Sequence, residues 1–262
     1  MNDWINVALK ASLEASQAIM DIYESDDVGV EYKEDASPLT RADRAAHHVI
    51  LRHLEPTGIP VLSEEGKHMP FEERSQWDEL WIVDPVDGTK EFIKRNGEFT
   101  VNIALVRQGR VAGGVVLAPV LGHAYVGVVG EGAWRLDVAA DVDAAWDTRV
   151  SLPLNAGKRA FTVVASRSHM SPETEAYVEE AKSVHGEVNL ISKGSSLKLC
   201  MVAEGTADAY PRFAPTMEWD TAAGQAVCEA AGCDVIDQNT GAPMRYNRED
   251  LLNAWFLVAR SS

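Results

Sequence analysis

Residues 79–90 read ELWIVDPVDGTK, an apolar run that leads straight into two aspartates three positions apart. The run is rich in β-formers, and Pro85 cannot donate to a sheet ladder, so a strand should end near Asp84. Gly88 permits a positive φ or a close backbone approach, and Thr89 follows it with a hydroxyl. Acids, amides and a hydroxyl at one strand end suit a hard cation such as Mg²⁺. Because Asp-Pro and Asp-Gly are also ordinary turn dipeptides, this segment alone leaves a plain turn as an equal alternative.

Two further segments place acids at the edge of a regular element. Residues 61–66 (VLSEEG) form a short apolar run that ends in paired acids, and residues 218–224 (EWDTAAG) place an acid where a helix of small residues should begin. Each alone would be an ordinary solvated loop or helix cap. With the first segment they form a set of four acids from three separate parts of the chain: Glu64, Asp84, Asp87 and Asp220.

The three motifs, in this order, resemble the inositol monophosphatase superfamily of Mg²⁺-dependent, lithium-sensitive phosphatases. Within that superfamily, four further segments are similar to the bacterial 3′(2′),5′-bisphosphate nucleotidases of sulfur assimilation: residues 37–43, 90–105, 194–198 and 210–213. The resemblance covers essentially the whole chain. Its acidic motifs are highly specific for the superfamily and less specific for the substrate.

The resemblance implies a site for two or three Mg²⁺ ions. Glu64, Asp84 and the backbone carbonyl of Val86 would hold the first ion, and Asp84, Asp87 and Asp220 would hold the second. Asp84 would therefore bridge the two ions. In two-metal sites the ions lie about 3.5 to 4 Å apart and stabilise both the attacking and the leaving oxygen.

The nucleophile expected at this site is water, because the loop offers no cysteine and an aspartyl phosphate would need an acid free of metal. By resemblance, Thr89 would orient and deprotonate this water, Asp43 would polarise the threonine hydroxyl, and Glu64 would belong to the same catalytic group. Thr40 and Asp43 also resemble a capping box at a helix start, with Asp in place of the usual Glu. One acid could serve both roles.

Contacts to the phosphate that is cleaved are expected in two places, the loop of residues 84–90, here called the metal loop, and the start of a helix expected after Ser196. Gly88, Thr89 and Lys90 lie where backbone amides and one ammonium could bind this phosphate. Ser195 and Ser196 precede an expected helix, whose start would suit an anion. Serine at such a position is more often just a cap, and both interpretations stay open.

Two cations are candidates for holding a second phosphate, against a solvated or structural role. These are Lys198 and Arg212, because each lies in a family-like motif of an otherwise acidic chain. Glu218, two residues before Asp220, has no assigned role, since relatives often carry a neutral residue there. The full expected substrate-binding set is Glu64, Asp87, Gly88, Thr89, Lys90, Ser195, Ser196, Lys198, Arg212 and Asp220.

The composition agrees with one globular enzyme that acts on a small molecule, here a bisphosphate nucleotide. The chain has 262 residues, 46% of them hydrophobic, and a formal net charge of −16. Such a length can bury a large core in one domain or two tightly joined halves. The acidic balance argues against a nucleic-acid polymer as partner, because such polymers bind basic stripes. Bound metal ions would supply the local positive charge that attracts a phosphate.

The cysteines Cys200, Cys228 and Cys233 form no C-x-x-C pair and cannot all be bridged to one another. We therefore expect buried thiols in a reducing compartment, the cytoplasm. No run approaches the about 20 apolar residues of a membrane span, and no transmembrane segment or secretion signal is expected. Peripheral contact with the cytoplasmic face of the inner membrane stays open, as does the choice between a monomer and a homodimer.

The order of the expected elements indicates an α/β (α+β) fold. Apolar residues recur at helical spacing from Trp4 to Ile22, and a second helix is expected over about 41–54. Strand-like runs separated by turns between residues 97 and 137 predict an antiparallel meander. Beyond residue 161, strand and helix patterns alternate, as in an α/β unit.

The expected domain organisation is a single domain over residues 1–262 with two sub-halves. An Asp- and Ala-rich stretch at about 139–158 marks the expected seam between them. The sub-halves would span about 1–145 and about 155–262. The resemblance implies a layered αβαβα sandwich with the metal site between the halves.

The function that the resemblance implies is a Mg²⁺-dependent phosphomonoesterase. It would remove the 3′-phosphate of adenosine 3′,5′-bisphosphate to give AMP and phosphate, and could also act on 3′-phosphoadenylyl sulfate, in sulfur assimilation. An inositol or sugar monophosphatase is the closest rival, because the metal residues are shared and only the substrate pocket differs. A catalytically silent metal or nucleotide sensor is the alternative of another class, and the complete set of acids with Thr89 argues against it.

Overall fold

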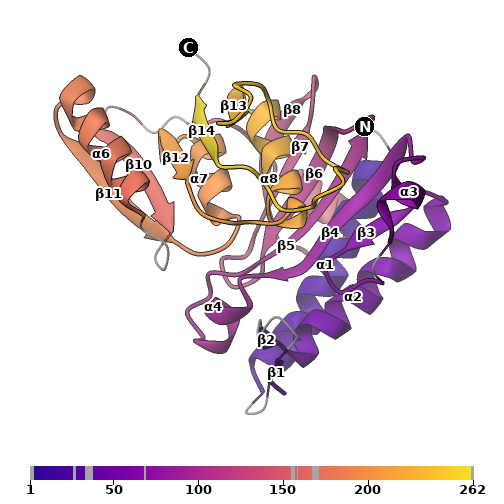
Figure 1. Cartoon of the computed structure of the whole chain (residues 1–262). Helices are drawn as coiled ribbons and strands as arrows, with labels where there is room; N and C mark the ends of the chain where they lie inside the picture. Colours follow the sequence, from indigo (N-terminus) through magenta and orange to yellow (C-terminus); the bar gives the residue numbers. More distant parts are fainter. Residues whose placement is uncertain are drawn as a thin grey trace.

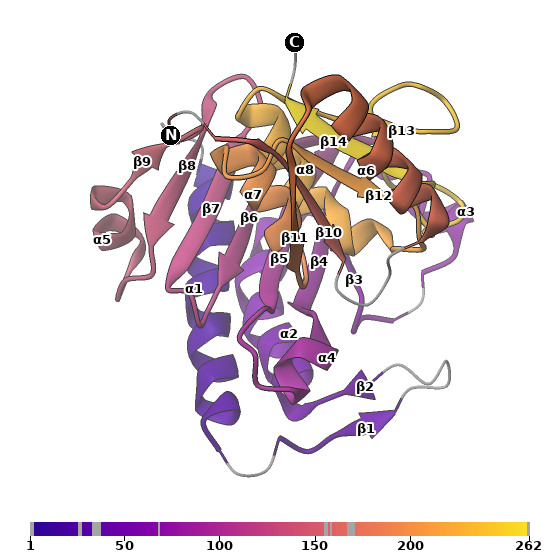
Figure 2. The same ribbon diagram turned by 90° about the vertical axis from the view of Figure 1, so that its left-hand side faces the viewer.

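The computed structural model of the protein describes residues 3–25, 28–32, 38–67, 69–154, 157, 159–166 and 171–260. Ser37 of the family-like motif and residues 155, 156 and 158 of the expected seam lie outside the described residues. The described chain stacks in five layers, in the order helices, sheet, helices, sheet, helix (Figures 1 and 2). The expected αβαβα sandwich is therefore confirmed.

Helices α1 (Asp3–Tyr23) and α2 (Arg41–Leu54) form the first layer and pack on one face of a seven-stranded sheet. The strand order is β3-β4-β5-β6-β7-β8-β9, and every pair except β3–β4 is antiparallel. The expected antiparallel meander is confirmed as β5 to β8. The strands are β3 (Val61–Ser63), β4 (Glu79–Asp87), β5 (Thr100–Arg107), β6 (Arg110–Ala118), β7 (His123–Val128), β8 (Gly132–Asp137) and β9 (Val150–Ser151).

Helices α7 (Leu197–Glu204) and α8 (Glu218–Ala230) lie between the two sheets, and α6 (Pro172–His185) covers the outer face of the second sheet. This second sheet has the strand order β11-β10-β12-β14-β13. Its strands and helices alternate along the chain, as expected. The strands are β10 (Phe161–Ser166), β11 (Val188–Lys193), β12 (Ala209–Arg212), β13 (Cys233–Asp237) and β14 (Phe256–Arg260).

The shorter elements lie in the connections. The expected seam contains the short helix over Val142–Asp147 and strand β9, and β9 pairs with β8. The first sheet thus extends to residue 151, past the expected end of the first half at about 145. The short elements are β1 (Glu31–Tyr32), β2 (Pro38–Leu39), a 3₁₀ turn at Glu55–Thr57, α3 (Phe71–Arg74), α4 (Thr89–Ile93) and α5 (Val142–Asp147).

Helix α8 lies close to the first sheet because small residues meet at the contact. A Cβ atom added at Gly114 would lie 2.8 Å from the Cα of Ala223, and one added at Gly127 would lie 2.6 Å from the Cα of Val227. Both distances are shorter than van der Waals contact, so a side chain at either glycine would push α8 away. These glycines therefore let α8, the helix that carries Asp220, lie close against the first sheet.

Strand β4 continues past its expected end. It spans Glu79–Asp87, and its register with β5 shifts between Asp84 and Asp87. Pro85 lies inside this irregularity, where its missing N–H interrupts no regular ladder. The expectation that the strand ends near Asp84 is therefore wrong: the proline produces a bulge, and both acids belong to the strand.

Three apolar cores stabilise the layers of the described chain: one between α1, α2 and the first sheet, a second around α7 and α8, and a small third one between α6 and the second sheet. Cys200, Cys228 and Cys233 are buried and free, as expected, and all three belong to the second core. Among the helices of the described segments, none combines the length and the apolar character that a membrane crossing requires.

Candidate active site

Three of the four predicted acids converge at one point. Asp84 and Asp87 come from the end of β4, Asp220 comes from the first turn of α8, and one carboxylate oxygen of each lies within 4.8 Å of the others. On a regular strand, residues three apart point to opposite faces of the sheet. The bulge inserted between Asp84 and Asp87 changes this alternation and lets both acids meet Asp220.

The charges of this cluster repel one another strongly. Burial, followed by the charges of Glu64 and Asp87, raises the pKa of Asp84 well above its ordinary value. Burial and the charge of Asp87 also raise the pKa of Asp220 to about 8. A divalent cation among the carboxylates would replace this repulsion by attraction. The donor set consists of hard oxygen ligands, so the residues present fit a cation such as Mg²⁺.

Glu64 and Val86, the other expected ligands, lie at the edge of the cluster. The Glu64 N–H donates to the carbonyl of Val83 (3.1 Å), which holds the end of β3 against β4. The charge of Glu64 reaches Asp84, but its carboxylate is not one of the three that converge. The Val86 carbonyl accepts a hydrogen bond from the Thr89 hydroxyl at 3.2 Å. The roles of Glu64 and Val86 as ligands stay predictions.

Asp43 contacts both the helix start and the metal loop. Its Oδ2 atom accepts the N–H (2.7 Å) and the hydroxyl (2.6 Å) of Thr40, which completes the expected capping box of α2. Its Oδ1 atom accepts the Thr89 hydroxyl at 3.2 Å. Burial raises the pKa of Asp43. Gly88, with φ +92°, turns the chain between β4 and α4 and so directs Thr89 toward this acid.

Ser196 directly contacts Asp87, one of the three converging acids. It is buried, and its hydroxyl lies 2.8 Å from Oδ2 of Asp87 and 2.6 Å from the carbonyl of Asp220. The same hydroxyl accepts the Asn102 side-chain amide at 2.9 Å, and that amide also lies 3.4 Å from Asp87. Ser196 precedes α7 but makes no side-chain capping bond. Ser196 and Asn102 therefore hold one oxygen of Asp87.

Asn102 is a residue of this site that the sequence analysis missed. A signal was present, because Asn102 is a polar residue inside the otherwise apolar stretch of β5 from Val101 to Val106. Its register partner on β4 is Asp84, so it lies directly beside the acidic cluster. Recognising it required the pairing of β4 with β5 across the bulge.

A cavity of about 130 Å³ opens beside Asp87 and Asp220, and four cationic side chains line it. Three of these cations were expected, and Lys193 was not. Of the expected substrate-binding set, Glu64, Thr89 and Ser196 are not among the lining residues. The cations are Lys90, Lys193, Lys198 and Arg212, and the lining also includes Gly88 and Ser195.

Lys198 and Arg212 both make structural contacts in the wall of this cavity. The buried Lys198 ammonium donates to the carbonyl of Ser195 (2.5 Å), and burial lowers its pKa to about 8. Arg212 donates to the carbonyl of Pro215 (2.8 Å), while its buried Nε–H has no hydrogen-bond partner among the residues that the structure describes. Buried donors are rarely left unpaired, and because the Arg212 side chain lines the cavity, its guanidinium lies where an anionic group of a ligand would be bound.

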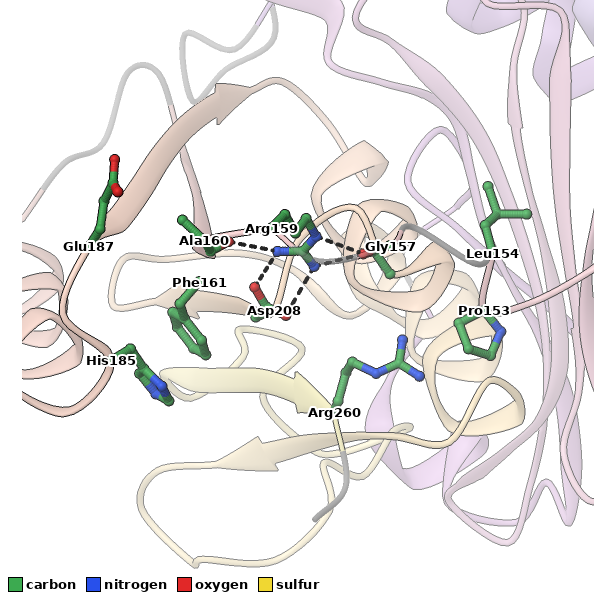
Figure 3. Close-up of a pocket in the computed structure, with 11 residues that line it drawn as sticks. Pro153, Leu154, Gly157, Arg159, Ala160, Phe161, His185, Glu187, Asp208 and Arg260 are labelled. Carbon is green, nitrogen blue, oxygen red and sulfur yellow. Dashed lines mark hydrogen bonds and ion pairs between the residues drawn. The ribbon is translucent and has the colours of Figure 1, made fainter.

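A larger hollow, of about 760 Å³, lies elsewhere in the second half of the chain. Figure 3 shows Arg159 at its centre, hydrogen-bonded to Asp208, and the stacked rings of Phe161 and His185 at its side. None of the predicted site residues lines this hollow. The acidic cluster and its cationic cavity are therefore the candidate active site.

Comparison with known proteins links this geometry to one family. The sequence model of the inositol monophosphatase family matches residues 1–261, which include every residue of the site. The 3′(2′),5′-bisphosphate nucleotidase CysQ of Escherichia coli strain K12 is 47% identical over 250 residues, which cover 94% of this chain and 95% of that protein. The protein of the same name from Salmonella typhimurium strain LT2 is 48% identical over 250 residues, with coverages of 93% and 94%.

A solved structure shares both the fold and the sequence. It is the crystal structure of CysQ from Bacteroides thetaiotaomicron, described as a bacterial member of the inositol monophosphatase family. It is 50% identical to this chain, superimposes with a TM-score of 0.89, and the match covers 98% of this chain and 97% of that one.

Proposed function

This chain belongs to the inositol monophosphatase family, and we propose that it is a Mg²⁺-dependent phosphatase that removes the 3′-phosphate of adenosine 3′,5′-bisphosphate, giving AMP and phosphate. The same reaction on 3′-phosphoadenylyl sulfate is part of the proposal, because that molecule carries the same 3′-phosphate. The place of action is the cytoplasm, in sulfur assimilation. The three buried free thiols agree with a reducing compartment.

The proposal rests on one observation: acids that could hold metal ions and cationic side chains line the same cavity. Asp87 and Asp220 stand in the same cavity as Lys90, Lys193, Lys198 and Arg212, in a chain with a net charge of −16. A phosphate bound at the acids through metal ions and by Lys90 would leave Lys193, Lys198 and Arg212 for a second anionic group. An inositol monophosphate has no such group, so the cavity favours a bisphosphate.

The side chains of the site have defined tasks in this reaction. Bound Mg²⁺ ions supply positive charge for the transferring phosphoryl group and lower the pKa of water. Asp84, Asp87 and Asp220 would hold the ions, with Glu64 and the Val86 carbonyl completing their coordination.

Thr89 and Asp43 would remove a proton from the attacking water. The Thr89 hydroxyl passes its proton toward Oδ1 of Asp43 and accepts one from the water, which then attacks the phosphorus atom. The bond from phosphorus to the 3′-oxygen breaks, that oxygen takes up a proton from solvent water and leaves as the hydroxyl of AMP, and Asp43 returns its proton to solvent. Ser196 and Asn102 keep the Asp87 carboxylate in place during these steps.

The test compares phosphate release from adenosine 3′,5′-bisphosphate and from inositol 1-phosphate, with Mg²⁺ and with a chelator. We expect Mg²⁺-dependent release with the higher kcat/KM for the nucleotide. A higher kcat/KM for inositol 1-phosphate would keep the metal mechanism and overturn the substrate. Release from neither ester would favour a catalytically silent sensor.

A further inference from the structure

Residues 247–253, here called the strap, cross the start of α8 two residues before Asp220. The Glu218 N–H donates to the carbonyl of Leu251 (3.0 Å), and the Asn253 N–H donates to the carbonyl of Thr216 (2.8 Å). In Figure 1 the yellow chain of the strap extends from α8 toward α3. The backbone of the strap is thus bonded to the turn from which the Asp220 helix begins.

The side chain of Glu218 fastens the strap to α8. It is completely buried, and its Oε2 atom accepts the N–H of Asn247 at 2.6 Å. Its Oε1 atom accepts both the N–H and the Nε–H of Arg248, each at 3.1 Å. Because all three partners are donors, an acceptor-only carboxylate matches them and an amide does not.

Arg74 holds the other side of the strap. This guanidinium is only 2% exposed and donates to the Asn247 side chain (2.8 Å) and to the carbonyls of Arg248 (3.0 Å) and Glu249 (3.2 Å). Asn247 returns a bond to the Arg74 carbonyl (2.7 Å). The Nε–H of Arg74 donates to the carbonyl of Met69 (3.1 Å), in the chain that leads from Glu64 to α3.

The strap therefore connects the two segments that carry the outer acids of the site. Glu64 directly follows β3 of the first sheet, and Asp220 lies in α8 of the middle helices. A small cavity of about 150 Å³ is lined by Glu64, by Trp219 and by Leu251 of the strap. Carboxylates of like charge repel one another, so a metal site needs neighbouring contacts that hold its acids at a fixed separation.

We propose that Glu218 and Arg74 are positioning residues which, through the strap, fix the separation of Glu64 and Asp220 and so set the affinity of the site for Mg²⁺. This inference rests on the metal site of the proposed function. Residues that orient metal ligands without contacting the metal typically lower the metal affinity by about 10- to 100-fold when they are removed.

The test is calorimetric titration of Mg²⁺ into the metal-free full chain without substrate. In Glu218→Gln, whose amide faces N–H donors, we expect the Kd for Mg²⁺ to rise about tenfold or more. Turnover at low Mg²⁺ should fall as the affinity falls, and should recover in excess Mg²⁺.

The matched control is Glu229→Gln, on the same helix roughly 16 Å further along. Glu229 is half-buried and accepts the Gln225 amide at 2.7 Å, and its variant should keep the wild-type Kd.

A second variant covers the case in which Glu218→Gln does not fold. Arg248→Lys keeps the Glu218 carboxylate, the positive charge and the backbone N–H donor, but removes the Nε–H donor to Oε1 of Glu218 and the guanidinium donor to Asn253, and the same rise in Kd is expected. A Kd for Mg²⁺ within twofold of wild type in a folded strap variant overturns the inference. Absence of Mg²⁺ binding by the wild-type chain overturns the proposed function as well, so the two failures are distinguishable.

Discussion

The Thr89 hydroxyl donates to Oδ1 of Asp43 across 3.2 Å, while Oδ2 of the same acid accepts both donors of Thr40. Asp43 therefore joins the first turn of α2 to the start of α4, two elements 46 residues apart in sequence. The helix cap fixes the orientation of the carboxylate, and this orientation leaves one oxygen directed at the threonine. The two interpretations of Asp43, as a cap and as the partner of Thr89, describe one arrangement.

Replacing Asp43 separates catalysis from capping. Asp43→Asn keeps an oxygen for the Thr40 N–H but cannot take the Thr89 proton, so we expect kcat to fall by about 10²- to 10⁴-fold. Thr40→Ala removes a capping hydroxyl and leaves the Asp43 carboxylate, so unfolding should become easier by about 1 kcal/mol with a much smaller loss of kcat. Steady-state kinetics and thermal melts of both variants check this. Equal losses of kcat would show that Asp43 acts only as a cap.

The stability of the metal-free chain should depend on pH through Asp220. Burial and Asp87 raise the pKa of Asp220 to about 8 in the folded state, whereas in the unfolded chain it is about 3.9. A pKa that is higher in the folded state than in the unfolded state stabilises the folded protein fully at pH values below the unfolded-state pKa. This stabilisation is lost as the pH rises toward the folded-state pKa. With a chelator present, Tm should therefore fall between about pH 4 and pH 8.

Two variants isolate this pH dependence. Asp220→Asn should flatten the fall in Tm because its side chain does not titrate, and it should lower turnover by orders of magnitude without unfolding the protein. The exposed Asp143 provides the matched control, and Asp143→Asn should retain the wild-type slope and activity. Since Mg²⁺ replaces protons among the carboxylates, adding it should raise Tm more at pH 8 than at pH 5. An unchanged slope in Asp220→Asn would contradict the assignment.

Arg212 should distinguish bisphosphate from monophosphate substrates. Within the described part of the chain its buried Nε–H has no hydrogen-bond partner, and the side chain lines the cavity with Asp87 and Asp220. Arg212→Ala should raise KM for adenosine 3′,5′-bisphosphate by about tenfold or more, the cost of a charged hydrogen bond, while changing KM for inositol 1-phosphate little. Arg245→Ala removes an exposed arginine that donates to the Gln108 carbonyl and should alter neither constant. Equal effects of Arg212→Ala on both esters would rule out recognition of a second phosphate.

Lithium at millimolar concentration should inhibit the enzyme, as expected for the lithium-sensitive superfamily that the chain resembles. Lithium is a small hard cation, so its effect should depend on the carboxylate oxygens that would hold Mg²⁺. Phosphate release at fixed Mg²⁺ and increasing lithium chloride measures the effect, with sodium chloride of equal ionic strength as the control. Equal rates in the two salts would count against this metal chemistry.

The amino-acid sequence alone indicated the elements and the chemistry of the acids, because both are short-range patterns. The helix expected over about 41–54 matches the bounds of α2. The acids occur within short motifs whose order resembles one family, so no contact between distant residues was needed to identify them. The capping box of Thr40 and Asp43 was recognisable for the same reason.

The tertiary structure decided how these acids are held. The bulge at Pro85 appears only when β4 pairs with β5, and without it Asp84 and Asp87 would face opposite sides of the strand. Asn102 and Ser196 reach Asp87 from β5 and from the start of α7, and Arg74 reaches the strap across more than 170 residues of chain. Such contacts depend on strand register and layer packing, which arise only when segments far apart in the sequence are brought together.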